Sequence, residues 1–310
     1  MGSRGGGKRD DRSGARRDDL LGGLAIALAA VLFGGVVIMG KTLPSDLPVP
    51  SMLAVRFGIA AVLLVLIQLV RRQPLRPGRG EWWRLALLGA AGYAVEATFF
   101  FSALGRGSAS AVTLLFFTYP VWVALLSAIL GFGLPGWLVA GSLVAAVAGA
   151  GLVVASGGGL DISAAGIGFS LASAFTYSFY LLGADALVRD TAPIVSAMWV
   201  SGAAAAGLAI FSVAGGAERF PEGADEWLRV TGLGALTAAA FAFLFLGLRR
   251  IGALRTAIIA ALEPVATSAM AVAILGEPLR AGVALGGALI LAGAVAATVA
   301  RGRPEPEGVP

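Results

Sequence analysis

The chain has 310 residues, of which 58% are hydrophobic and 13% charged, with a formal net charge of +5. This charged fraction is about half that of a typical soluble domain, so an ordinary soluble globule is excluded. Cysteine and histidine are both absent, which excludes disulfides, thiol nucleophiles, imidazole bases and the usual zinc sites. We therefore expect neither a metal nor a cofactor.

Apolar stretches of about 20 residues, the length that an α-helix needs to cross a bilayer, alternate with short charged segments. Residues 1–19 and 301–310 are polar and are expected to be tails, the first of them disordered. Between them the sequence predicts an all-α, polytopic membrane protein. The ten expected helices lie at residues 20–40, 52–70, 85–104, 110–130, 137–155, 164–183, 194–214, 229–248, 256–275 and 282–300.

The second half of this pattern repeats the first. Residues 107–120, GSASAVTLLFFTYP, resemble residues 251–264, IGALRTAIIAALEP, at an offset of 144. Each copy holds five expected helices, and this odd number makes the second copy enter the membrane from the opposite side. The sequence therefore predicts two inverted repeats, at residues 20–156 and 163–300, a common plan of secondary transporters.

The basic residues favour one orientation. With the amino terminus inside the cell, 17 of the 23 lysines and arginines fall in cytoplasmic segments, as the positive-inside rule requires. We therefore expect a multi-pass protein of the cell membrane with both termini cytoplasmic. The basic pI, near 10.2, reflects this topology, and nucleic-acid binding is not expected.

Short motifs recur at the ends and centres of these helices, in a characteristic order. They are Lys41, Arg56-Phe57, Pro120-Val121, Glu263-Pro264-Val265 and Leu275-Gly276-Glu277. In this order and spacing they resemble the EamA-type members of the drug/metabolite transporter superfamily, over residues 20–300. The resemblance implies a ten-helix transporter of small organic solutes. The chain differs from the family pattern at Gly34 and Tyr177, where a tryptophan is frequent, and has Phe132 opposite Glu277.

Glu96 lies near the centre of the third expected helix, where an acidic group costs about 2.5–3.5 kcal/mol. At helical spacing it shares a face with Tyr93 and Phe100. We interpret Glu96 as a proton-coupling group or as the counter-ion of a cationic substrate. A structural hydrogen bond to a neighbouring helix is the alternative.

Pro120 and Pro264 occupy corresponding places in the two repeats. Matched interruptions of this kind point to a transport site, although both prolines could instead serve helix packing. Tyr119 precedes the first proline and could form an aromatic wall or pack against its neighbours. Glu263 precedes the second, and Thr267 follows one turn later; Glu263 is either a site residue or a structural part of the kink.

Hydroxyl groups follow one face of the sixth expected helix at Ser170, Ser173, Tyr177 and Tyr180. This stripe either lines the substrate path, with Ser173 and both tyrosines as candidates, or forms interhelical hydrogen bonds. Lys41 and Arg56 are expected near the outer mouth, where they either snorkel to the interface or form a gate.

No phosphate-binding loop or nucleotide domain is present, so the energy must come from a gradient. The sequence predicts a secondary transporter that exports a small organic metabolite or drug-like compound by alternating access, with protons as one possible partner. The alternatives are an importer or exchanger of nucleoside- or sugar-phosphate-like solutes, and a sensor or scaffold without transport. An enzyme is not expected, because no catalytic motif is present. The chain is expected to act in the lipid bilayer as a monomer or homodimer.

Overall fold

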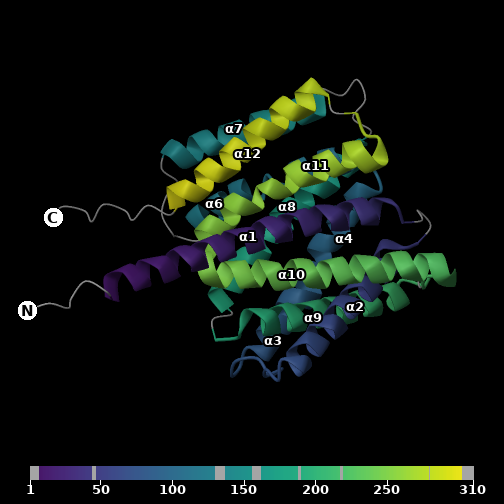
Figure 1. Cartoon of the computed structure of the whole chain (residues 1–310). Helices are drawn as coiled ribbons and strands as arrows, with labels where there is room; N and C mark the ends of the chain where they lie inside the picture. Colours follow the sequence, from purple (N-terminus) through teal and green to yellow (C-terminus); the bar gives the residue numbers. More distant parts are fainter. Residues whose placement is uncertain are drawn as a thin grey trace, which may run out of the picture.

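The computed structural model describes residues 7–43, 47–129, 137–155, 162–187, 190–216, 219–278 and 280–301, and this part of the chain is helical without strands. The helices are α1 (Gly7–Lys41), α2 (Val49–Val70), α3 (Trp82–Leu87), the π-helix η1 (Leu88–Tyr93), α4 (Ala94–Leu104), α5 (Ala109–Phe116), α6 (Tyr119–Ile129), α7 (Trp137–Ala155), α8 (Ala164–Leu187), α9 (Pro193–Ala214), α10 (Gly223–Ala260), α11 (Leu262–Leu275) and α12 (Ala281–Arg301). Figure 1 shows them as one bundle.

Six helical segments are long and apolar enough to cross a membrane: Leu20–Lys41, Val49–Val70, Trp82–Leu104, Ala164–Ala184, Pro193–Ala214 and Gly223–Gly247. Shorter apolar helices cover Ala109–Val123, Leu262–Leu275 and Ala281–Gly293. Large apolar side chains point outward from the bundle, for example Val70 and Ile210, as expected where lipid replaces water. The prediction of an all-helical, polytopic membrane protein is confirmed.

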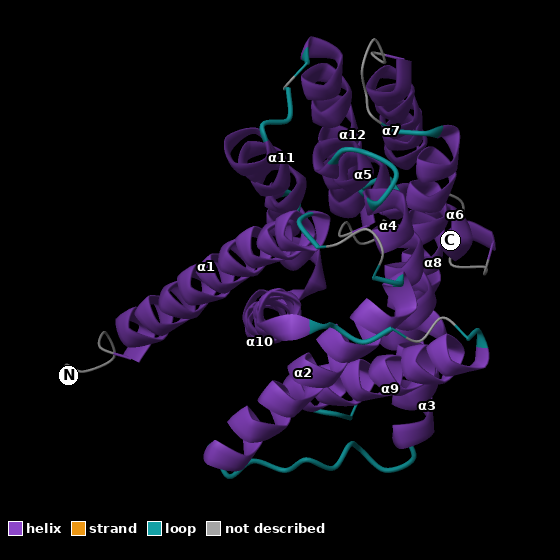
Figure 2. Ribbon diagram, turned by 90° about the vertical axis from the view of Figure 1, so that its right-hand side faces the viewer, coloured by secondary structure: helices purple, strands orange, loops and turns teal. Residues whose placement is uncertain are grey.

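The helix contacts have the symmetry of two equivalent halves. α1 packs along α10, and its counterpart in the second half, α8, packs along η1 and α4. α2 packs against α9, and α7 against α12, which pairs each helix with its own counterpart (Figure 1). Figure 2 shows α10 nearly end-on, between the α2 and α9 layer and the group that holds α11 and α12. A pseudo-two-fold relation between the halves produces this pattern.

The fourth and ninth expected helices are each broken in two at corresponding points. α5 ends at Phe116 before α6 begins at Tyr119, and α10 ends at Ala260 before α11 begins at Leu262. Pro120 and Pro264 lie in the first turn after each break, where a helix tolerates a proline because that turn needs no N–H donor. The breaks are therefore a property that the duplicated sequence encodes twice.

Helix boundaries differ from the sequence prediction at several points, most at residues 7–19 and 249–255. Residues 7–19, expected as disordered tail, form the first turns of α1, because a helix propagates from an existing span without a new nucleation cost. α10 continues through residues 249–255, expected as a loop. The carboxyl-terminal tail 302–310 lies outside the described residues.

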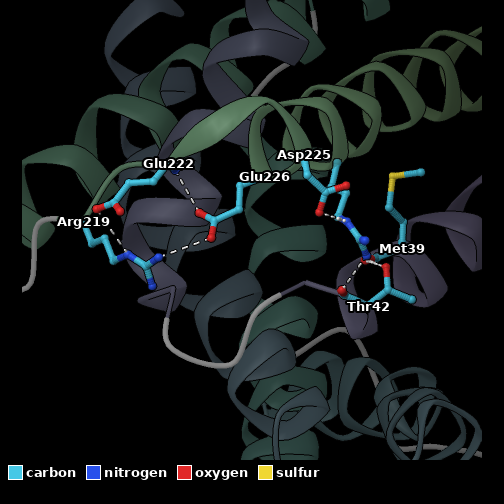
Figure 3. A network of polar contacts seen from close by, with 7 residues as sticks. Met39, Thr42, Arg219, Glu222, Asp225 and Glu226 are labelled. Atoms are coloured by element: carbon cyan, nitrogen blue, oxygen red, sulfur yellow. Dashed lines mark hydrogen bonds and ion pairs between the residues drawn. The ribbon is translucent and has the colours of Figure 1, made fainter.

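The connections between helices meet in two groups. In one, Arg229 donates to the Thr42 carbonyl at 3.1 Å and to Asp225 at 2.9 Å, at the start of α10 (Figure 3). In the other, Glu81 accepts from the Asp190 backbone N–H at 3.0 Å and from the Thr191 hydroxyl. Each contact joins segments that the topology prediction assigns to the same side of the membrane.

Candidate functional site

All four tyrosines of the chain meet in one continuous series of ring contacts inside the bundle. The ring centroids are 5.0 Å apart for Tyr119 and Tyr177, 5.8 Å for Tyr177 and Tyr180, and 5.2 Å for Tyr180 and Tyr93. These distances are those of attractive aromatic pairs. Three helices, α6, α8 and η1, thus bring together tyrosines that lie far apart in the sequence, and we call this series the tyrosine chain.

The π-helix η1 sets the position of Tyr93, its last residue. A π-helix holds more residues per turn than an α-helix and shifts the register of the helix beyond it, which is frequent at functional sites. Gly89 allows α9 to approach, because a Cβ there would lie 2.4 Å from the Val200 carbonyl oxygen. The Tyr93 ring then contacts Phe57 at 5.5 Å and Phe241 at 5.6 Å. Sequence analysis did not single out Phe57 or Phe241 as site residues.

Glu96 lies less than one turn beyond Tyr93 and is 5% exposed. Its Oε1 accepts a hydrogen bond of 2.9 Å from the Ser173 hydroxyl on α8. Two residues predicted separately as site candidates are therefore direct partners across α4 and α8. Ser170, one turn before Ser173, donates to the Gly166 carbonyl of its own helix.

Phe100 joins the tyrosine chain through Phe116, which sequence analysis did not single out. The Phe116 ring lies 5.3 Å from Phe100, 5.5 Å from Tyr119 and 5.2 Å from Tyr177. Phe116 ends α5 directly before the helix break. A large side chain beside a proline-associated break was the available sequence signal for this residue.

Arg56 is buried, at 3% exposure, so its side chain does not snorkel to the interface, which was one of the two expectations for it. Its Nε donates to the Thr237 hydroxyl at 2.8 Å, and its guanidinium lies 4.7 Å from the Phe57 ring and 4.9 Å from the Phe101 ring. α2 begins at Val49, three residues earlier than predicted, which moves Arg56 deeper into the bundle. There, ring faces and a hydroxyl replace the water that a snorkelling side chain would reach.

Glu263 lies in the first turn of α11, next to the buried Pro264. It is near enough to Tyr93, Tyr119 and Glu96 for a charge on its carboxyl group to act on them. Both acids therefore lie near the same series of rings.

Thr267, one turn beyond Glu263, is fully buried, and its hydroxyl has no hydrogen-bond partner in the described part of the chain. A Cβ at Gly34 of α1 would lie 3.1 Å from this hydroxyl oxygen. Gly34, where the family frequently has a tryptophan, thus lets α1 approach Thr267 and Met270 more closely than a larger residue would. A buried hydroxyl without a partner can form a hydrogen bond to a ligand, and no hydrogen bond within the protein has to be broken first.

Lys41 and Glu277 lie at one end of the bundle. The Lys41 ammonium donates to the Leu104 and Gly107 carbonyls, both at 2.6 Å, where α4 ends. Glu277 accepts from the Ala109 N–H at 2.7 Å and from the Ser110 hydroxyl at 3.0 Å, where α5 begins. Each charge has the sign that its helix end favours.

The acids of the interior, Glu96 and Glu263, come from different helices. Within the described ranges, no three acidic residues lie close enough together to hold a metal ion. What the interior offers is ring faces, two carboxylates, one guanidinium and hydroxyls. Such a set recognises an organic molecule by stacking, charge and a few hydrogen bonds.

An all-helical membrane protein with two symmetric halves, matched helix breaks and a polar, aromatic interior has the architecture of a secondary transporter. The model of the EamA-like transporter family matches residues 20–155 and again residues 164–299, so the chain belongs to this family. A crystal structure of a protein with 24% sequence identity is similar, with a TM-score of 0.62, over 92% of this chain and 97% of that chain. At this identity the likeness shows the fold alone. No curated protein matches the chain significantly.

Proposed function

We propose that the protein is a secondary active transporter that exports a small organic compound by alternating access, with proton coupling through Glu96. Membership of a transporter family and the two symmetric halves support alternating access. The bias of the basic residues supports an orientation with both termini in the cytoplasm. The four tyrosines, with Glu96 and Ser173 beside them, supply the substrate site.

The observation that carries the coupling role is the hydrogen bond from Ser173 to Glu96, 2.9 Å long and buried beside the tyrosine chain. A hydroxyl both donates and accepts. It can donate to the carboxylate and accept from the protonated acid, so the same pair satisfies Glu96 in either state. A carboxyl group with such a partner keeps a hydrogen bond both before and after it takes up a proton.

Glu263 has a structural reason to be acidic that Glu96 lacks. It stands in the first turn of α11, where exposed N–H groups favour a negative charge, and it precedes the proline of a helix break. Glu96 comes after η1 without a break in the helix. We therefore assign coupling to Glu96 and a mainly structural role to Glu263.

The test begins with a substrate. A thermal-shift screen of purified protein against amino acids, nucleobases, polyamines and dyes identifies ligands, because a ligand at about 100 times its dissociation constant stabilises a fold by about 2.7 kcal/mol. Flux of the best ligand is then measured in proteoliposomes under opposed pH gradients. Efflux and uptake assays in cells establish the direction.

Glu96→Gln keeps the shape of the side chain and its bond to Ser173 but cannot exchange a proton. We expect it to fold normally and to lose the pH dependence of flux, whereas Glu263→Gln, the matched control, retains it. Unchanged rate and pH dependence in Glu96→Gln would show that Glu96 only packs the helices.

A further inference from the structure

A groove opens on the outer surface of the bundle between the third helical segment and α8. Its volume is about 360 Å³, and Leu87, Ala91, Gly92, Phe175, Phe179 and Tyr180 form most of its lining. Leu87 is 53% exposed and Phe179 49% exposed. Both walls belong to segments that are long and apolar enough to cross the membrane. The groove therefore faces lipid, and its size suits the apolar body of a drug-sized molecule.

One side chain borders both this groove and the interior. Tyr180 lines the groove and is also a member of the tyrosine chain, with its ring centroid 5.2 Å from that of Tyr93. The Tyr180 ring packs against Gly92, since a Cβ at position 92 would lie only 3.3 Å from Tyr180 Cδ2. Rotation of the Tyr180 side chain would therefore connect the lipid-facing groove with the rings beside Glu96.

The interior behind Tyr180 holds two acidic side chains and one buried basic side chain. Glu96 and Glu263 contribute the two carboxyl groups, and Glu96 lies near enough to Tyr180 and Arg56 for a charge on it to act on both. Arg56 is the one buried cation of the described membrane segments, and its guanidinium lies between two phenylalanine rings and bonds to Thr237. The faces of the tyrosine rings also attract positive charge. When both carboxyl groups are ionised, a single organic cation would therefore balance the site.

We propose that the groove is a lateral entrance through which a lipophilic organic cation passes from the bilayer to the tyrosine chain. Its apolar body fits the groove, and its charge is attracted toward Glu96 past Tyr180. A hydrophilic solute would lose its hydration against the leucine and phenylalanine side chains of the groove, so this route would be unfavourable for it. This inference rests on the proposed transport function, for which it names the substrate class and the route.

The test compares two ions of nearly equal size and shape and opposite charge, tetraphenylphosphonium and tetraphenylborate. Binding of each to the purified protein in lipid nanodiscs is measured by equilibrium dialysis, with empty nanodiscs subtracted. We expect saturable binding of the cation, at least tenfold tighter than that of the anion. Glu96→Gln is expected to weaken cation binding at least tenfold. Equal binding of the two ions would overturn the proposal.

The route is tested by filling the groove. Ala91→Phe places a ring in it from an exposed position and is expected to slow the association of tetraphenylphosphonium at least tenfold. Val62→Phe is the matched control, since Val62 is also lipid-exposed, at 59%, but lies on α2 outside the groove. Phe179→Trp narrows the groove from the α8 wall and should reproduce the loss if Ala91→Phe fails to fold. Association as fast as in the wild type in both filled variants would overturn the lateral entrance.

The two proposals fail separately. Binding of the cation without flux of any ligand in proteoliposomes would overturn transport and leave the site assignment standing. Flux of a different ligand from a protein that does not bind tetraphenylphosphonium would overturn the substrate class and the entrance alone.

Discussion

Lys41 and Glu277 bind opposite sides of the same corner of the chain. The ammonium of Lys41 bonds to the carbonyls that end α4, and the carboxylate of Glu277 bonds to the N–H groups that begin α5. Helix ends leave such groups unpaired unless a side chain supplies the partner. The corner between the third and fourth membrane segments is therefore tied to the ends of α1 and α11.

Removing the carboxylate should loosen this corner. Glu277→Ala loses three hydrogen bonds at the start of α5, and loss of such a cap costs about 1 kcal/mol, up to about 2. Thermal unfolding in detergent measures the change. Glu222→Ala removes an exposed acid whose nearest contact to Arg219 is 3.8 Å, so it should stay within about 0.5 kcal/mol of wild type. Equal effects of the two substitutions would contradict the capping role.

The setting of Arg56 should require a planar guanidinium. Arg56→Lys keeps the charge but loses the stacked geometry between two rings and the directed bond to Thr237. We expect a loss of about 1–2 kcal/mol in the free energy of unfolding. Arg71→Lys, at the exposed end of α2, is the control and should change little. An unchanged free energy of unfolding in Arg56→Lys would show that only the positive charge at position 56 contributes to stability.

The contact between α7 and α12 should not accept a side chain at Gly149. A Cβ there would lie 2.5 Å from the Gly286 carbonyl oxygen and 2.9 Å from the Ile290 backbone nitrogen, so the two helices would have to separate. We expect Gly149→Ala to cost about 1–3 kcal/mol. Gly151→Ala, two residues further in the same helix, meets nothing within 4 Å and should stabilise by up to about 1 kcal/mol. The thermal unfolding midpoints of Gly149→Ala and Gly151→Ala, measured side by side, test this prediction.

The absence of native cysteine permits a direct test of topology. Single cysteines replacing Gln73 and Ala224 lie on exposed positions at opposite ends of the bundle. An impermeant maleimide should label position 224 in intact cells and position 73 only after permeabilisation. Labelling of position 73 in intact cells would reverse the orientation. Gly78 is less suitable, because a Cβ there would lie 2.9 Å from Asp190 Cβ.

Apolar length and repetition were sufficient to predict the helices and the two halves, because the bilayer sets helix length and a duplicated sequence repeats its breaks. The breaks at Phe117 and Ala261 result from the prolines, a local property. The tyrosines of α8 were predictable as one face of a helix. The contacts of Tyr93 and Tyr119 with these tyrosines could not be predicted, because periodicity shows which residues share a helix face but not which helix lies opposite that face.

The remaining differences also have physical causes. The π-helix that ends at Tyr93 adds a residue to its turn and changes the register that an α-helical pattern assumes. Arg56 was expected near water because a charged residue normally is, and only the rings of Phe57 and Phe101 explain its depth. Glu277 belongs to the motif Leu275-Gly276-Glu277, but its partners at Ala109 and Ser110 are 168 and 167 residues away in the sequence.

The carboxylate of Glu277 exists in one repeat only, because the corresponding residue in the other repeat is Phe132, which lies outside the described residues. Perfect duplicates would give the two open conformations of a transporter the same energy and equal occupancy. A side chain found in a single copy removes that degeneracy. A difference of about 1.4 kcal/mol, the size of one charge-assisted hydrogen bond, changes a ratio of two populations about tenfold. Under the proposed alternating access, one residue would thus be enough to set which side of the membrane the resting protein faces.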